Sequence, residues 1–353
     1  MLQGARVVTQ EKILVTGATG HVGSHFVPLA VKAGYTVRAL VRNTSNTGLL
    51  EHLPVELAEG DLAKPETLAP ALEDVDMVIH SGAHVGDWGP ADTYRQANVL
   101  SLEHMLTTAE RMGQLKRWIQ ISSLGVYPPR HHYGTDETIT PNLAGLDGYT
   151  QTKAEAEVIL KRHRDEFNFP IVILRPGFIY GAGDRHALPR IVAKLQAGKM
   201  KFIGRGDQLL NNTYVGNLVD AVFLAMEHPA ALGETFNIRD ERLVTRLEFI
   251  NTIADYLGKP HPGHFPEALA RLLVRPIERV AKMRGATSPP LLTSGQIKFM
   301  TLNLDYSIDK AKRLLDYQPR VDFQEGIRQA LDHLVGDAPP STTSSDHTES
   351  VSA

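Results

Sequence analysis

The sequence has no cysteine, which excludes disulfide bonds, thiolate nucleophiles and metal sites with cysteine ligands. It also has no dense run of lysine and arginine. Its 37 basic and 40 acidic residues give a formal net charge of -3, so we do not expect a nucleic-acid partner. No stretch of about 18 uncharged apolar residues occurs, and the first ten residues lack the apolar core of a signal peptide. We therefore expect neither a membrane-spanning segment nor secretion, and we expect a cytoplasmic protein.

The 15 histidines include no H-x-x-x-H pair that comes with a partner carboxylate, and His131 and His132 lie in a segment with prolines. We expect no bound metal. With 353 residues, of which 42% are hydrophobic and 22% charged, the chain is long enough for one large or two unequal domains around a well-buried core. The composition is that of an ordinary globular enzyme.

Short apolar segments alternate with amphipathic segments through the first half of the chain. Expected strands cover residues 12–16, 36–41, 55–59, 77–80, 118–122 and 171–174, and expected helices cover residues 24–33, 66–72, 94–111 and 149–167. Strands that alternate with helices over short connections indicate right-handed βαβ units and a parallel sheet covered on both faces. The sequence therefore predicts an α/β fold with a doubly wound parallel Rossmann sheet.

After residue 180 the pattern becomes irregular. We expect helices at 188–197 and 218–227, a segment at 211–215, and a strand at 235–238 that returns to the main sheet. Prolines at positions 260, 262, 266, 276, 289 and 290 predict a loop-rich region with an interrupted helix between residues 266 and 283. We expect a Rossmann domain made of residues 11–182 and about 207–240, a smaller, mostly helical substrate-binding domain made of residues 183–206 and 241–335, and a disordered tail at 336–353.

The strand at 12–16 runs into Gly17-Ala-Thr-Gly20-His-Val-Gly23, in which three glycines recur with two residues between them. Gly17 permits a tight turn, Gly20 has no Cβ to block a phosphate, and Gly23 lets the next helix pack close to the sheet. Backbone N–H groups and the dipole of that helix then favour an anion. The motif predicts a dinucleotide site, although an ordinary strand-to-helix turn carries such glycines too.

Tyr149 and Lys153 stand four residues apart, on one face of an expected helix. An ammonium near a phenol, together with an oxidised nicotinamide, favours the phenolate and lowers the tyrosine pKa below its ordinary value near 10. By itself the pair also fits a solvated helix face. Ser122 and Ser123, however, end an apolar strand at the carboxyl edge of the sheet, where ligands bind, although Ser123 also fits a helix or turn cap. The three side chains together favour general acid–base catalysis.

Six motifs occur in order along the chain. They are Thr16-Gly-Ala-Thr-Gly-His-Val-Gly23, Gly60-Asp61, His80-Ser-Gly-Ala83, Ser122-Ser-Leu-Gly-Val-Tyr127, Tyr149-x-x-x-Lys153 and Leu174-Arg-Pro-Gly-Phe-Ile-Tyr-Gly181. Over about residues 11–335 the chain resembles the extended short-chain dehydrogenase/reductase family, which is part of the NAD-dependent epimerase/dehydratase superfamily. The resemblance implies that Tyr149 exchanges a proton with the substrate oxygen, that Lys153 binds the nicotinamide ribose and tunes Tyr149, and that Ser123 hydrogen-bonds the substrate oxygen.

The resemblance also implies a nicotinamide cofactor and the residues that bind it. These are Gly17, Thr19, Gly20, His21, Val22, Gly23, Arg42, Asp61, Leu62, Ser81, Gly82, Ala83, Asn98, Tyr149, Lys153, Pro176 and Gly177. Asp61 is expected to face the adenine amino group and Asn98 to support the active site, although each also fits a bland role in a turn or on the surface. A carboxylate about 20 residues after the glycine turn binds the ribose of NAD, whereas an arginine accommodates a 2'-phosphate. Arg42 occupies that place, so we expect NADP(H) to be favoured over NAD(H).

Phe178 stands where family members that act on nucleotide sugars commonly carry asparagine. The segments 175–185, 212–217 and 306–312 more closely resemble the 3β-hydroxysteroid dehydrogenase branch. That branch implies interconversion of a secondary alcohol and a ketone on an apolar, steroid-like substrate by hydride transfer, with contacts from Val85, Ser123, Phe178 and Asn212. The alternatives are an epimerase or dehydratase that uses bound NAD on a nucleotide sugar, and a redox-sensing scaffold without catalysis.

The segment 267–283 forms an expected amphipathic helix. Leu269, Leu272, Leu273, Ile277 and Val280 lie on one side, with Arg271, Arg275, Arg279 and Lys282 around the rest. Such a helix fits the surface of a membrane, but a lid over the substrate pocket or a subunit contact is the interpretation that the sequence favours. The family suggests a homodimer formed through the helices near Tyr94 and Tyr149. We expect no ligand other than a small-molecule substrate and the cofactor.

Overall fold

The computed structural model describes residues 11–86, 88–286, 288–290 and 292–336, and its centre is a parallel sheet of seven strands. The strand order is β12-β7-β5-β4-β1-β2-β3. The strands are β1 (Lys12–Thr16), β2 (Thr36–Val41), β3 (Val55–Glu59), β4 (Met77–His80), β5 (Arg117–Ile121), β7 (Ile171–Pro176) and β12 (Thr235–Ile238). Every neighbouring pair is parallel, and the expected return of 235–238 to the main sheet is confirmed, with β12 beside β7.

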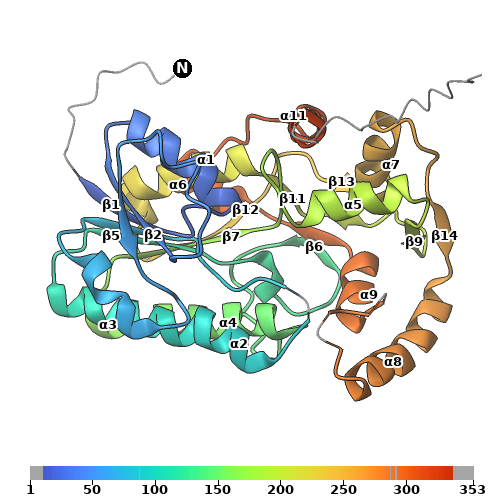
Figure 1. Ribbon diagram of the computed structural model, residues 1–353, viewed down its shortest axis with the longest axis horizontal. Coiled ribbons are helices and arrows are strands. Elements are labelled where there is room, and N and C mark those ends of the chain that lie inside the picture. Colours follow the sequence, from blue (N-terminus) through green and yellow to red (C-terminus); the bar gives the residue numbers. More distant parts are fainter. Residues whose placement is uncertain (1–10, 87, 287, 291, 337–353) are drawn as a thin grey trace, which may run out of the picture.

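Helices cover both faces of this sheet, as Figure 1 shows. One face carries α1 (His21–Lys32), α6 (Val215–Glu227) and α10 (Asp309–Leu315), and the other carries α3 (Ser101–Met112) and α4 (Gly148–Phe167). The central strands β4 and β5 are buried along their whole length because side chains pack against both of their faces. The doubly wound α/β fold expected from the sequence is confirmed.

A second region of short strands and helices lies beside the main sheet (Figure 1). Its two-stranded pairs are β8 (Phe178–Tyr180) with β11 (Asn212–Tyr214), β9 (Lys201–Ile203) with β14 (Gly263–Phe265), β10 (Leu209–Leu210) with β13 (Val244–Thr245), and β6 (His132–Thr135) with β15 (Leu304–Tyr306). Its helices are α5 (Ala187–Gln196), α7 (Arg246–Tyr256), α8 (Glu267–Met283), α9 (Ser294–Thr301) and α11 (Phe323–Gly336). Aromatic side chains of Tyr180, Phe202, Phe249 and Phe323 form much of its core. The exact division of the chain into two domains stays a prediction.

Three expected helices differ in the structure. Residues 66–72 form two short 3-10 turns, Pro65–Thr67 and Ala69–Leu72, because Pro65 and Pro70 lack the N–H that an α-helix needs. The helix expected at 94–111 is longer: α2 (Ala91–Arg95) continues through a π-helical turn, Gln96–Leu100, into α3. The helix α8 is continuous, and the expected interruption is wrong, since Pro276 is accommodated within it.

The expectations of no membrane-spanning segment and of a C-terminal tail can be compared with the structure. Within the described ranges, no helix has the length and apolar character that crossing a membrane requires. The expected tail begins at Gly336, the last residue of α11, and its remaining residues lie outside the described part of the chain.

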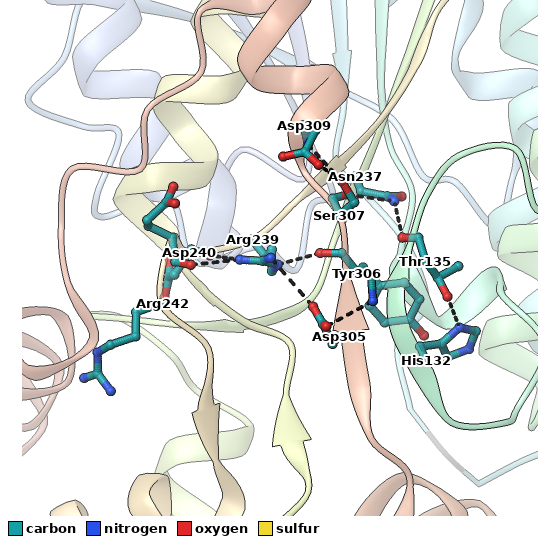
Figure 2. Close-up of polar contacts among 12 residues, drawn as sticks. His132, Thr135, Asn237, Arg239, Asp240, Arg242, Asp305, Tyr306, Ser307 and Asp309 are labelled. Atoms are coloured by element: carbon teal, nitrogen blue, oxygen red, sulfur yellow. Dashed lines mark hydrogen bonds and ion pairs between the residues drawn. The ribbon is translucent and has the colours of Figure 1, made fainter.

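Polar contacts fix the second region to the end of β12 (Figure 2). Arg239 donates from Nε to the Tyr306 carbonyl oxygen at 2.6 Å, and its Nη2 lies 3.7 Å from Asp305 Oδ1. Asn237 donates from Nδ2 to the carbonyl oxygens of Thr135 at 3.4 Å and Ser307 at 3.2 Å. The pair β6–β15 is therefore held against the edge strand of the main sheet.

Candidate active site

The glycine turn lies where the order of the strands reverses. β1 has β2 on one side and β4 on the other, so the connections that follow β1 and β4 leave the sheet in opposite directions. Gly17 has a φ of +70°, and a Cβ there would lie 2.8 Å from Gly82 N. A Cβ on Gly23 would lie 2.2 Å from Gly17 O. Both positions therefore require glycine, and the two turns touch at the crevice where ligands bind in such sheets.

Gly20 differs from its neighbours because one side of it is open. Among the described residues, a Cβ on Gly20 would meet only the Gly17 carbonyl, with its oxygen at 3.1 Å. His21, Val22 and Gly23 begin α1, and the first N–H groups of a helix have no partner within it. These groups and the helix dipole form a cradle that fits a pyrophosphate.

The turn after β4 is tied to the end of β1. Ser81 Oγ donates to the Thr16 carbonyl oxygen at 2.7 Å, and Gly82 N donates to Thr16 Oγ1 at 3.0 Å. His80 Nδ1 lies 3.0 Å from the same Thr16 hydroxyl oxygen. Burial lowers the pKa of His80 to about 3, with a smaller contribution from the charge of Lys153, so its imidazole is neutral. The Ser81 hydroxyl proton and the Gly82 N–H are therefore both used within the protein, and a contact of this turn with the cofactor stays a prediction.

Arg42 and Asp61 lie at the ends of β2 and β3. Arg42 is exposed, its backbone N–H donates to Ser45 Oγ at 3.0 Å, and within the described ranges its guanidinium has no ion-pair partner. Asp61 Oδ1 accepts from Ala63 N at 2.9 Å, so this carboxylate stabilises its own turn. Leu62 packs close to Gly82: a Cβ added to Gly82 would lie 2.9 Å from Leu62 Cδ1. Arg42 is therefore an exposed cation at this edge.

A contact of Pro176 and Gly177 with the cofactor stays a prediction, but the backbone N–H of Gly177 is already engaged. Gly177 N donates to Ile238 O at 3.1 Å and to Thr213 Oγ1 at 3.0 Å, so this donor is used inside the protein. A Cβ at Gly177 would lie 1.9 Å from Asn211 O. The glycine is required because β11 passes directly against it, and the backbone N–H of Gly177 is not available to a cofactor.

Asn98 is buried in the π-helical turn and holds a loop in place. Its Oδ1 accepts from His84 N at 2.7 Å, and its Nδ2 donates to His84 O at 3.0 Å and to Thr152 Oγ1 at 3.1 Å. Since all of these partners belong to the protein, Asn98 positions the loop after β4 against α4. Extra turns of this kind in a helix are frequent at functional sites.

Ser123, Tyr149 and Lys153 come together at the carboxyl end of β5. Ser123 follows β5 and caps a short turn by accepting from Gly125 N at 3.0 Å. Tyr149 and Lys153 lie one turn apart on α4, which begins with the Asp147 capping box. Lys153 Nζ lies 5.8 Å from the centroid of the Tyr149 ring and donates to Ile121 O at 2.7 Å. The Ser123 and Tyr149 hydroxyls are hydrogen-bonded to each other.

The expected lowering of the Tyr149 pKa is wrong for the protein by itself. Burial, assisted by the charge of Asp147, raises the Tyr149 pKa to about 12, while the hydrogen bond with Ser123 opposes this rise. Burial also lowers the pKa of Lys153 to about 8, and the charge of Glu157 works in the other direction. At neutral pH the site therefore presents a protonated phenol beside an ammonium, which is the arrangement of a proton donor.

A buried polar network lies behind Lys153, and the sequence analysis missed it. Glu157 Oε1 accepts from Ser122 Oγ at 2.7 Å and from Arg175 Nε at 2.8 Å, and Glu157 Oε2 lies 2.5 Å from Arg175 Nη2. Arg175 Nη1 donates to the Tyr127 hydroxyl at 2.7 Å. Glu157 and Arg175 are each only 1% exposed. The spacing of Glu157 four residues after Lys153 was the available signal, because it places a carboxylate next to the ammonium on one helix face.

The expected substrate residues divide into two groups. Phe178 packs its ring against Phe249 and Phe299, at centroid distances of 5.6 Å and 6.4 Å, and Val85 is 64% exposed in the loop after β4. Asn212 is fully buried, where Nδ2 donates to Asp240 Oδ2 at 2.9 Å and Oδ1 accepts from Val244 N at 3.0 Å. A substrate contact by Asn212 is wrong, since its amide joins β11 to β13.

His21 and His25 have the H-x-x-x-H spacing after all, and the fold brings Asp184 near His21. Burial lowers the pKa of His21 to about 4, and the charge of Asp184 opposes this shift. His25 Nε2 lies 2.8 Å from Ala182 O and is thereby engaged with the protein. The described residues contain no group of three or more histidine or carboxylate side chains that could hold a metal ion.

Comparisons with known proteins agree with this geometry. Residues 13–238 match the model of the NAD dependent epimerase/dehydratase family. The 2-alkyl-3-oxoalkanoate reductase of Stenotrophomonas maltophilia is 30% identical over 90% of this chain and 98% of its own, and the decarboxylating sterol-4-alpha-carboxylate 3-dehydrogenase of Saccharomyces cerevisiae is 30% identical over 91% and 97%. The UDP-glucuronic acid 4-epimerase of Bacillus cereus, solved with UDP-glucuronic acid and NAD, superposes with a TM-score of 0.74 at 25% identity over 92% of this chain and 99% of that chain.

Proposed function

Because the chain belongs to the NAD-dependent epimerase/dehydratase family, we propose that it interconverts a ketone and a secondary alcohol. The reacting carbon in this proposal is adjacent to the carbon that bears a carboxylate. The chain is a nicotinamide-dependent oxidoreductase of the extended short-chain type. The observation that carries the proposal is the joint placement of the Ser123 and Tyr149 hydroxyls and the Lys153 ammonium at the end of β5.

The substrate class is supported by what two relatives have in common. A 2-alkyl-3-oxoalkanoate has its ketone next to the carbon that bears the carboxylate, and a sterol-4-carboxylate that reacts at position 3 has the same relation between the two groups. Both molecules are otherwise apolar. Phe178, with Phe249 and Phe299 around it, forms a cluster of aromatic rings in the second region, which is consistent with an apolar substrate.

The three catalytic side chains have distinct tasks. A bound nicotinamide supplies or accepts the hydride at the reacting carbon. In the direction of reduction, Tyr149 donates its hydroxyl proton to the substrate oxygen, and Ser123 donates a hydrogen bond to the same oxygen. The Lys153 ammonium stabilises the phenolate that remains. In the direction of oxidation, the alcohol proton returns to Tyr149.

The proposed substrate class is tested with three matched alcohols in the presence of NADP+. These are a 2-alkyl-3-hydroxy acid, its methyl ester and the alcohol that lacks the carboxyl group. The kcat/KM for the acid is expected to be at least about tenfold higher than for the other two alcohols, because loss of a matched polar contact costs of the order of 1 to 3 kcal/mol. Equal rates for all three contradict the carboxylate requirement, and no cofactor reduction with any of them contradicts the proposed function.

The preference for NADP(H) over NAD(H) rests on Arg42. Arg42 is exposed directly after β2, and an arginine at this place in a Rossmann fold accommodates a 2'-phosphate. The variant Arg42→Ala is expected to raise KM for NADPH by about tenfold and to leave KM for NADH unchanged, since a charge-assisted hydrogen bond contributes about 1.5 to 3 kcal/mol. Arg328→Ala, which also removes an exposed arginine, is the control. Equal changes for both cofactors would reject the assignment.

The oligomeric state and the cellular compartment also remain proposals. A homodimer through α2, α3 and α4 is supported by two exposed apolar side chains, Leu100 in the π-helical turn between α2 and α3 and Val158 on α4. Light scattering that gives the mass of one chain would contradict it. Cytoplasm remains the proposed compartment, and fractionation of the source cells tests it.

A further inference from the structure

Five apolar side chains of α8 point away from the body of the protein. Leu272 is 70% exposed and Met283 is 76% exposed. The others are Leu269, Leu273 and Val280, each about two-fifths exposed. At about 100° per residue these five side chains fall within one arc of about 100° on the helix. We call them the α8 apolar stripe.

The rest of α8 separates cleanly into two further faces. Ala270 and Val274 are buried against Ile297 of α9 and form a small core of their own. Arg271, Arg275 and Arg279 are exposed on the arc between this buried face and the stripe. Arg271 pairs with Glu267, whereas Arg275 and Arg279 have no ion pair in the part of the chain that the structure describes. The apolar stripe is thus bordered by a row of unpaired positive charge.

Two occupants of the stripe are disfavoured by these observations. A lid would bury the stripe over a pocket, yet Leu272 and Met283 are the most exposed of its members. A two-fold contact between two copies of α8 would bring each face against its own copy, so the arginine rows would approach each other. Like charges in such a contact repel.

We propose that α8 docks this protein on an anionic lipid surface, with the apolar stripe in the headgroup boundary and Arg275 and Arg279 against lipid phosphates. An amphipathic helix with this division of faces lies in the plane of a membrane interface rather than across it. α8 forms the outer edge of the second region, where a flat surface can reach it (Figure 1). The inference does not rest on the proposed reaction.

The docked end of the molecule is connected to the candidate active site. Trp88 Nε1 donates to Ala286 O at 3.0 Å, so the chain just after α8 contacts the loop after β4. The same loop carries exposed Val85, and Asn98 holds its His84. An apolar substrate that partitions into lipid would therefore meet the enzyme near this loop.

The test is flotation of the purified full chain with vesicles of phosphatidylcholine alone and of phosphatidylcholine with phosphatidylglycerol. The wild-type protein is expected to float with the anionic vesicles and to be released by high salt. The double variants Leu272→Ser with Met283→Ser, and Arg275→Glu with Arg279→Glu, are each expected to lower the bound fraction by about tenfold or more.

Matched controls change the same properties at other places. Leu232→Ser with Val335→Ser removes two apolar side chains that are 45% and 48% exposed, and Arg313→Glu with Arg328→Glu reverses two exposed charges outside α8. Both controls are expected to float like the wild type. The proposal is overturned if wild-type protein stays unbound with anionic vesicles, if the apolar variant still floats, or if that variant instead converts a dimer to a monomer in light scattering.

Discussion

The region at the end of β5 and the region around Phe178 and α8 differ in how they present side chains to a ligand. Behind Lys153, each polar group has a defined partner, and Glu157 and Arg175 are almost completely buried. Around α8, large apolar side chains such as Leu272 remain exposed. The first region fixes a few atoms with short hydrogen bonds, whereas the second offers surface. We therefore expect changes in the two regions to have different signatures.

The largest expected difference between the two regions comes from Tyr149→Phe, which should lower kcat. Removing the hydroxyl deletes the proton donor, so kcat should fall by about a thousandfold for every substrate, which is within the range of general acid catalysis. Cofactor affinity, measured by titration with NADPH fluorescence, should change little. Tyr133→Phe removes an exposed hydroxyl and is the control. Near-normal turnover by Tyr149→Phe would show that another group moves the proton.

The next effect concerns the network that supports Lys153. Glu157→Gln leaves the buried Arg175 guanidinium without a charged partner, so the free energy of unfolding should fall by about 3 to 5 kcal/mol. Urea denaturation measures this change. Glu155→Gln, on the same helix, breaks an ion pair in which Arg95 is largely exposed and should cost less than about 1 kcal/mol. Equal losses for the two variants would mean that burial of the network does not govern its strength.

The pH dependence of reduction tests the charge on Lys153. Its pKa of about 8 in the folded protein lies below its ordinary value, so the ammonium is complete below pH 8 and is lost as the pH rises through 8. Tyr149, with a pKa of about 12, keeps its proton over this range. The kcat/KM for reduction should therefore be level below pH 8 and fall toward about tenfold per pH unit above it. A level profile up to pH 10 would contradict a requirement for the ammonium.

The smallest expected effect is a change in KM caused by a substitution at Phe178. Phe178→Leu reduces apolar contact with the substrate, so KM for a long-chain substrate should rise by a few-fold, on the order of 1 kcal/mol, while kcat and cofactor affinity stay unchanged. Phe167→Leu changes an exposed ring far from the site and serves as the control. A large fall in kcat would instead place Phe178 among the groups that align the reacting atoms.

The fold could be predicted from the sequence because its signals are local. Apolar runs such as the one before Gly17 specify buried parallel strands, and Gly23 is required by its contact with Gly17, which is close in the chain. The spacing of Tyr149 and Lys153 fixes their shared helix face for the same reason. Two helix predictions failed where proline was misjudged: at 66–72 it shortened the helix, and at Pro276 it did not interrupt one.

The remaining features depend on distances between segments that the sequence does not contain. Whether Asn212 faces a substrate or joins two strands depends on where β13 lies, and the sign of the Tyr149 pKa shift depends on how much protein surrounds the phenol. The ion pair of Glu157 with Arg175 joins α4 to strand β7 of the sheet. The apolar stripe of α8 was visible in the sequence, but only the packing of Ala270 and Val274 against α9 decided which side of the helix stays exposed. The sequence by itself determined most of the elements, the glycine turn after β1 and the shared helix face of Tyr149 and Lys153, because these follow from short-range spacing. Desolvation, pairing and exposure were decided by the tertiary structure, because each depends on what the rest of the chain places around a side chain.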